Sequence, residues 1–104
     1  MANYLLVYHG GSQPDSEAAG AAVMEAWTKW FQDLGDAVVD GGNPVGRNWT
    51  LTKDGTNEDG GSNPATGYSV IKADSMQRAL ELAGGCPHLQ ADGTVEICET
   101  FNAG

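Results

Sequence analysis

Near its amino terminus the chain reads Asn3-Tyr4-Leu5-Leu6-Val7-Tyr8-His9 and then reaches Gly10-Gly11. Aromatic and branched side chains occupy both sets of alternating positions, so this run predicts a strand that is covered on both of its sides. Neighbouring side chains in a strand point to opposite faces, and one layer of helices can cover only one of those faces. The run therefore predicts a second covering surface on the other side of the sheet.

Two amphipathic helices follow from the spacing of the apolar residues. Apolar side chains recur at helical spacing over residues 19–34, and Gly35 stands where a left-handed C-cap belongs. A second helix is expected to begin at Asp74 as its N-cap, with Gln77 at the capping-box position, and to end at Gly84-Gly85. Both apolar stripes predict packing on one face of a sheet.

Three further strands complete the pattern. Residues 37–39 form a short second strand that the glycines and proline of 40–44 are expected to stop, and residues 68–72 form the third strand. The last strand runs over 94–101, with Phe101 on its apolar face. The order predicts an α+β, ferredoxin-like βαββαβ fold, with both helices on one face of a four-stranded antiparallel sheet.

The whole chain, 1–104, is expected to be a single domain with one long insertion, residues 43–67, of low apolar content. A stretch of this length without regular structure is unusual, which predicts a lid, a binding loop or a hairpin. Trp49 to Thr52, followed by Asp54-Gly55, has the composition of a short edge strand and turn.

The uncovered side of the sheet predicts a homodimer in which two sheets pack face to face across a two-fold axis. The alternative is a monomer whose 43–67 segment folds over its own sheet.

Charge and motifs restrict the partners. The chain has 14 acidic and 5 basic residues, a net charge of −9, which argues against nucleic acid and anionic membranes and favours a small neutral or cationic ligand. There is no signal-like or membrane-spanning run, so a cytoplasmic location is expected. Cys86 and Cys98 are expected to be ordinary thiols, and no pattern predicts a metal or a cofactor.

Taken in order, six short motifs resemble the YCII-related family, in particular its DGPF-type branch. They are Tyr4-Leu5-Leu6-Val7-Tyr8, Trp27-x-x-Trp30-Phe31, Val39-Asp40-Gly41-Gly42-Asn43-Pro44, residues 67–75, residues 79–83 with Cys86-Pro87, and Gly93-Thr94-Val95-Glu96-Ile97. The resemblance covers nearly the whole chain, and it implies a dimeric α/β barrel built from two ferredoxin-like protomers.

The chain also departs from that family. Where the DGPF branch carries its name-giving motif, this chain has Asp59-Gly60-Gly61 and keeps only the Asp-Gly step. YCII-like proteins are thought to use a histidine on the first helix and an aspartate near the end of the second strand. The first helix here has no histidine, so the resemblance carries over only Asp40, and the family has no established common reaction.

Candidate site residues come from the strand ends and from the long insertion. His9 and Asp40 each end a strand, and a carboxylate beside an imidazole can support general acid-base chemistry. The candidate catalytic residues are His9, Asp40 and His88, and the candidate ligand-binding residues are Glu96, Trp49 and Tyr68. Each also has a structural interpretation: Asp40 as a turn residue bonded to its own backbone, and His88 as a loop residue at a helix end.

The sequence thus predicts a YCII-related homodimer of undefined molecular function, with a small-molecule pocket and His/Asp acid-base chemistry. The alternatives are a non-catalytic binding module and a dimeric adaptor or regulatory module.

Overall fold

The computed structural model describes residues 1–103, and its elements follow one another in the expected order. They are β1 (Ala2–Gly10), α1 (Glu17–Leu34), β2 (Val38–Pro44), β3 (Thr50–Thr52), β4 (Gly55–Asn57), β5 (Ala65–Ala73), α2 (Met76–Ala83) and β6 (Gly93–Glu99), with short 3-10 turns at Gly35–Ala37 and Pro87–Ala91.

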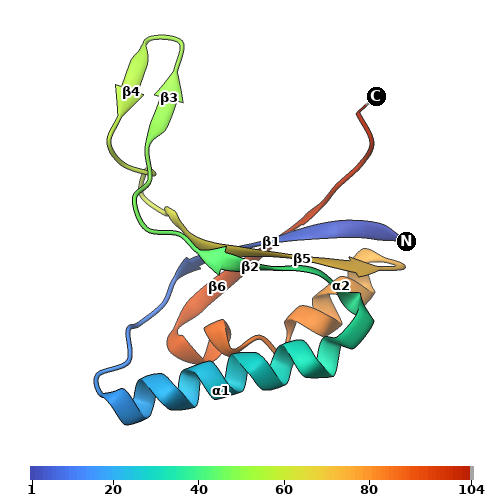
Figure 1. Cartoon of the computed structure of the whole chain (residues 1–104). Coiled ribbons are helices and arrows are strands. Elements are labelled where there is room, and N and C mark those ends of the chain that lie inside the picture. The colour runs from blue at the N-terminus through green and yellow to red at the C-terminus, as the bar shows by residue number, and fades with distance from the viewer. Residues whose placement is uncertain (104) are drawn as a thin grey trace.

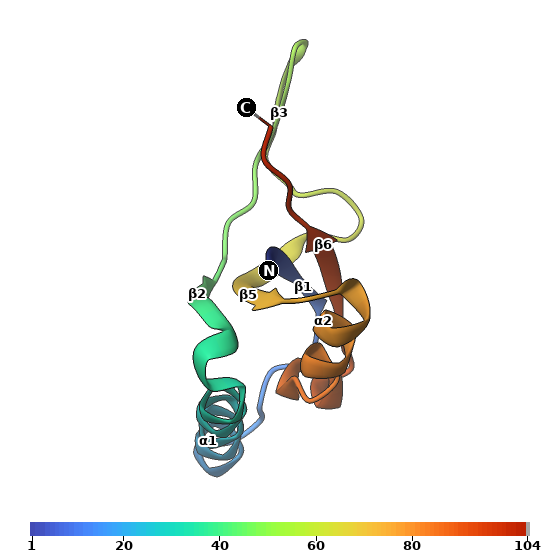
Figure 2. The ribbon, with the colours of Figure 1, turned by 90° about the vertical axis from the view of Figure 1, so that its right-hand side faces the viewer.

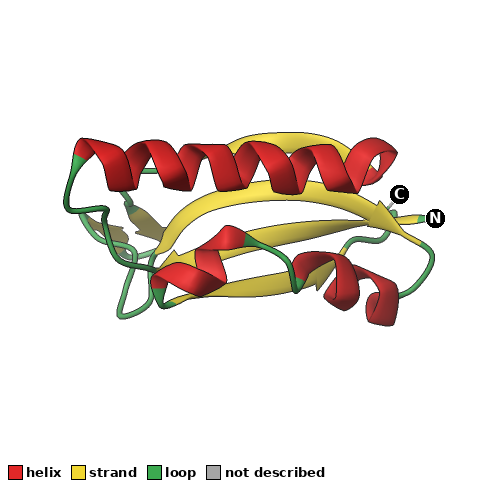
Figure 3. Cartoon of the chain, turned by 90° about the horizontal axis from the view of Figure 1, so that it is seen from below, coloured by secondary structure: helices red, strands yellow, loops and turns green. Residues whose placement is uncertain are grey.

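The main sheet has the strand order β2-β5-β1-β6, and every neighbouring pair is antiparallel. Both helices lie on the same side of this sheet, as the edge-on view of Figure 1 and the view from below in Figure 3 show. The predicted α+β, ferredoxin-like arrangement is therefore confirmed. Among the residues that the structure describes, no helix covers the opposite side of the sheet.

The core forms where one face of β1 meets the helices. Tyr4, Leu6 and Tyr8 are buried there, each 6% exposed or less. On α1, Trp30 lies against the same core, and its Nε1 donates a hydrogen bond to the Leu82 carbonyl oxygen at the end of α2 (3.1 Å). This bond satisfies a carbonyl that a helix end leaves without a helical partner.

Serine side chains cap both helices. The Ser16 hydroxyl accepts a hydrogen bond from the Ala19 N–H, and the Ser75 hydroxyl accepts one from the Arg78 N–H. The prediction that Asp74 caps α2 is wrong by one residue. Ser75 has the extended backbone of an N-cap, and its hydroxyl lies 3.1 Å from the N3 amide that a cap must reach.

The second strand does not stop at its glycines. β2 continues from Val38 to Pro44 by means of irregular pairing with β5 around Asp40 to Asn43. Gly42 allows this continuation, because its φ is 74° and a Cβ there would overlap the Tyr68 carbonyl oxygen.

The last strand ends earlier than expected. β6 stops at Glu99, and the Phe101 side chain is 85% exposed, so its assignment to the buried face is wrong. Val95 and Ile97 do pack against the core.

The long insertion contains the hairpin of β3 and β4, and residues 45–64 are called the arm from here on. All six residues of the two strands are exposed, and the arm rises away from the sheet on the side opposite the helices (Figures 1 and 2). The radius of gyration is 15.0 Å, against about 13 Å for a compact chain of 100 residues. The arm therefore does not fold over its own sheet.

Replacing Gly42 with Ala should destabilise the fold by about 2 kcal/mol or more, because the new Cβ meets both an unfavourable φ and the backbone of β5. Gly46→Ala is the matched control, since nothing lies within 4 Å of a Cβ at that position. Thermal unfolding of both variants checks this, and equal midpoints would contradict it.

Candidate functional site

The side of the sheet opposite the helices is called the open face. Leu5 lies between Val70 and Cys98 in the strand register, and Val7 lies between Tyr68 and Glu96. Of these side chains Glu96 is exposed, and the others are half-buried by their neighbours in the sheet. The open face is thus a small apolar surface bordered by a carboxylate.

His9 lies at one end of the open face and contacts two separate parts of the chain. Its Nε2 is 2.9 Å from Glu96 Oε1 on β6, and its Nδ1 is 3.0 Å from the Asn63 carbonyl oxygen and 3.3 Å from that of Pro64. The His9 side chain is 12% exposed, whereas that of Glu96 is 59% exposed. His9 thus joins the base of the arm to the last strand.

The partners of His9 determine its protonation state. A carboxylate and two carbonyl oxygens are all acceptors, so both ring nitrogens are placed to donate, which only the imidazolium can do. The hydrogen bond to Glu96 raises the pKa of His9 above its ordinary value, partial burial lowers it, and the bonds to Pro64 and Asn63 raise it further. The contacts and the raised pKa therefore favour the protonated His9 ring, held beside a Glu96 side chain that is largely open to solvent.

His88 holds the backbone of His9. Its Nε2 donates a hydrogen bond to the His9 carbonyl oxygen (2.8 Å), and its ring lies 5.4 Å from that of Tyr8. A side chain at Gly11 or Gly93 would overlap this ring. His88 is packed beneath the strand end, so it positions His9 and does not face the open side.

Asp40 caps a turn within its own strand, β2. Its carboxylate accepts a hydrogen bond from the Gly42 N–H (2.8 Å), the self-bonded turn that is the structural alternative for this residue. Within residues 1–103 no hydrogen bond joins Asp40 to His9, because β5 lies between β2, which carries Asp40, and β1, which carries His9. The carboxylate beside His9 is that of Glu96.

Tyr68 and Trp49 lie in different parts of the structure. Tyr68 is on β5 directly opposite Val7, so it belongs to the open face. Trp49 is on the arm, 51% exposed, with the Arg47 guanidinium 5.9 Å from its ring centre. The structure brings together His9, Glu96 and Tyr68 along the open face, and it places Asp40 and Trp49 away from them.

Sequence reasoning missed the link between His9 and the arm. The contacts are made by backbone carbonyls of Asn63 and Pro64, which carry no side-chain signal. Alternation did give one usable signal: His9 and Glu96 fall on the same face of adjacent strands once the register is known.

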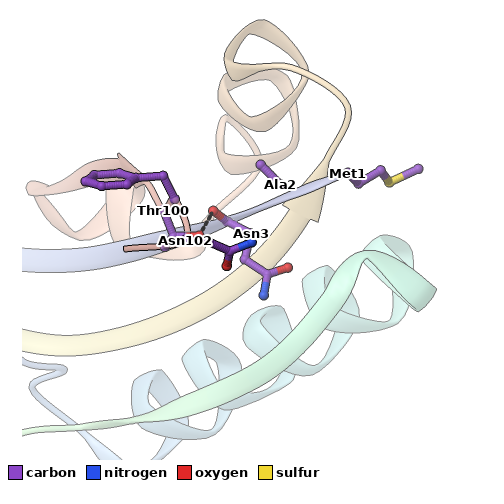
Figure 4. Close-up of a pocket in the computed structure, with 6 residues that line it drawn as sticks. Met1, Ala2, Asn3, Thr100 and Asn102 are labelled. Atoms are coloured by element: carbon purple, nitrogen blue, oxygen red, sulfur yellow. Dashed lines mark hydrogen bonds between the residues drawn. The ribbon is translucent and has the colours of Figure 1, made fainter. Parts of the chain in front are cut away.

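Two shallow hollows on the surface lie away from His9. One, of about 360 Å³, lies between Asn3 at the start of the chain and Thr100 and Asn102 near its end (Figure 4). There the Thr100 N–H and hydroxyl both donate to the Asn3 carbonyl oxygen, at 3.0 and 2.8 Å. The second, of about 370 Å³, lies beside Asp33 and Lys72. Neither hollow contains any of the candidate catalytic or ligand-binding residues.

Other reactive groups do not gather into a site. In the part of the chain that the structure describes, no three His, Cys, Asp or Glu side chains converge as metal ligands would. Both cysteines are free; burial raises the pKa of the Cys86 thiol to about 11, which keeps it protonated and weakly nucleophilic. No helix within residues 1–103 combines the length and apolar character needed to cross a bilayer.

Comparison with known proteins informs on the fold. No protein-family model matches the chain, and no curated protein matches it in sequence. Among solved structures, the chain is similar to 5-chloro-2-hydroxyhydroquinone dehydrochlorinase (TftG) from Burkholderia phenoliruptrix AC1100, in complex with 2,5-dihydroxybenzoquinone. The TM-score is 0.51 at 17% identity, over 96% of this chain and 95% of that one. The two proteins share the fold.

The His9–Glu96 pair should make stability depend on pH. The pKa of His9 is raised in the folded state, so the protonated ring stabilises the fold. This contribution to the free energy of unfolding is complete below the pKa of about 6.5 that histidine has in the unfolded chain, and it is lost as the pH rises through the pKa of the folded state. The difference in unfolding free energy between the wild type and His9→Gln should therefore be larger at pH 6 than at pH 9. Denaturant titrations at both pH values check this, and an unchanged difference would contradict the assignment.

Proposed function

We propose that the chain is a YCII-related protein of the DGPF-type branch, that it forms a homodimer through the open face, and that it binds a small molecule there beside His9 and Glu96. His9 serves as the proton donor and acceptor of this site. The observation that carries the proposal is that His9 bonds Glu96 at the border of an apolar sheet face that the chain's own helices leave uncovered.

The open face supports the homodimer. Leu5, Val7, Tyr68 and Val70 lie on adjacent strands and are only half-buried. Apolar side chains that are gathered on one surface gain free energy when a complementary surface covers them. A second copy offers the same surface, which a two-fold axis can pair with itself.

The His9–Glu96 pair supports acid-base chemistry. An imidazolium held between acceptors can act as a general acid, and after giving up its proton it can act as a general base. Glu96 favours the protonated ring and orients it, and its side chain is 59% exposed, so a ligand donor can reach it. This pair replaces the His9–Asp40 pair that the strand ends predicted.

The nature of the ligand follows from charge and from the shared fold. The net charge of −9 and the Glu96 carboxylate favour a neutral or cationic small molecule. TftG, which shares the fold, acts on a chlorinated hydroxyhydroquinone. Uncharged hydroquinones are therefore suitable first probes, with small amines as the cationic alternative.

An adaptor is the second candidate function. It is favoured by one observation: the arm exposes Leu51 by 78% and Trp49 by 51%, which suits contact with another macromolecule.

Ligand binding should depend on His9 and Glu96 but not on Asp40. A hydroquinone or amine that raises the thermal midpoint of the wild type is titrated calorimetrically into the variants. His9→Gln and Glu96→Gln should weaken binding at least tenfold, because each removes one half of the pair. Asp40→Asn, which keeps an acceptor for the Gly42 N–H, should change it less than twofold.

Other outcomes would assign the chain differently. If Asp40→Asn alone abolished binding, the ligand site would be assigned to Asp40 on β2 and not to His9 and Glu96. A dimer with no response to either class of probe would favour the adaptor.

A further inference from the structure

We propose that the arm of each copy extends along a second copy of this chain, with the face that carries Trp49 and Leu51 packed against the partner. The inference rests on the proposed homodimer and adds to it the surface that secures the two subunits to each other.

The ribbon of the arm has no buried residues of its own to stabilise it. β3 and β4 form a two-stranded ribbon of three residues each, and all six are exposed. Such a ribbon is marginally stable in water unless another surface packs on it. It stands clear of the sheet and of both helices in two perpendicular views (Figures 1 and 2). Its internal bonds, such as Thr50 hydroxyl to the Asp59 carbonyl oxygen (2.7 Å), maintain the ribbon but bury no apolar surface.

The ribbon has one apolar face. Leu51 points to one side of the ribbon, whereas Thr50 and its cross-strand partner Asn57 point to the other. Trp49 directly precedes β3, and continuing the alternation of the strand by one residue puts its side chain on the side of Leu51. Leu51 is 78% exposed. The face that carries the two large apolar side chains is the one that needs a partner.

The arm is placed and sized to reach a second copy. It rises on the side of the open face, opposite the helices (Figure 2). From Val45 to the turn at Asp54 the chain can extend about 30 Å at about 3.3 Å per residue, whereas packed sheets lie about 10 Å apart. An arm of that reach must run past the sheet of a copy seated on the open face.

The area of the open face also requires a further contact. Four strands about 4.8 Å apart, of seven or nine residues each at about 3.3 Å per residue, give a flat projected area of roughly 500 Å². A stable pair of proteins usually buries about 800 Å² on each side. The arm, which carries Trp49 and Leu51 on one side, supplies the missing area.

Charge favours a copy of this chain as the occupant. The arm carries Arg47 and Lys53, two of the five basic residues, and three of the fourteen acidic ones. The rest of the chain is strongly acidic, so the arm, with one acidic residue in excess, is the part that a second copy repels least, and the Arg47 guanidinium beside Trp49 can pair with a carboxylate of that copy.

The test compares two variants of the ribbon that introduce the same charge on opposite faces. Sedimentation velocity over a dilution series gives the dimer dissociation constant for the wild type, Leu51→Asp and Asn57→Asp. Leu51→Asp should raise that constant at least tenfold, and Asn57→Asp should change it less than twofold. At concentrations where the chains are monomeric, thermal unfolding of the body should be unaltered in both variants, because both side chains are exposed in the single chain.

A second measurement uses only the wild type. Hydrogen exchange of residues 45–64 is followed above and below the dissociation constant. The arm amides should exchange at least tenfold more slowly in the dimer.

The outcomes separate this inference from the proposal on which it rests. A wild type that stays monomeric at high concentration overturns both. A wild-type dimer that Leu51→Asp does not weaken, or that both variants weaken equally, overturns the arm contact alone, as does arm exchange that is the same in both states.

Discussion

The structure depends on the alternation of side chains along β1, the central strand that pairs with both β5 and β6. Tyr4, Leu6 and Tyr8 point to the helices and are almost completely buried, and Leu5 and Val7 point the other way. A strand with large apolar groups on both sides needs two covering layers, but this chain has helices on only one. The core, the open face and the proposed dimer all follow from this one mismatch.

The candidate site lies at the end of β1, where its regular pairing with β5 breaks down. There the register between β1 and β5 shifts at Tyr8 and His9, and the arm leaves the sheet just beyond, before Ala65. The His9 ring stabilises this irregular region through hydrogen bonds to the Asn63 carbonyl oxygen at the base of the arm and to Glu96. His88 in turn donates a hydrogen bond to the backbone carbonyl oxygen of His9. A cation at this point serves the fold, because it bonds acceptors from two elements, and it can also serve chemistry.

The open face, the arm and the net charge of the chain all bear on its association with a partner. The arm rises on the side of the sheet opposite the helices, which is also the side of the open face (Figure 2), so the proposed partner could contact both. The excess of carboxylates keeps such a chain in solution by mutual repulsion, and the basic residues of the arm lower that repulsion locally. The likeness to TftG concerns the fold.

Patterns in the sequence were sufficient for the fold, because alternation and helical spacing are local signals. They located both helices and the four main strands, and they placed a strand and turn near Trp49 and Asp54. They did not place Ser75 as a cap, the continuation of β2 through Gly42, or the exposure of Phe101, which depend on detailed backbone geometry. The pairing of His9 with Glu96 in place of Asp40 was decided only by the tertiary structure, since the strand order sets which carboxylate reaches the imidazole, and neither spacing nor composition encodes that order.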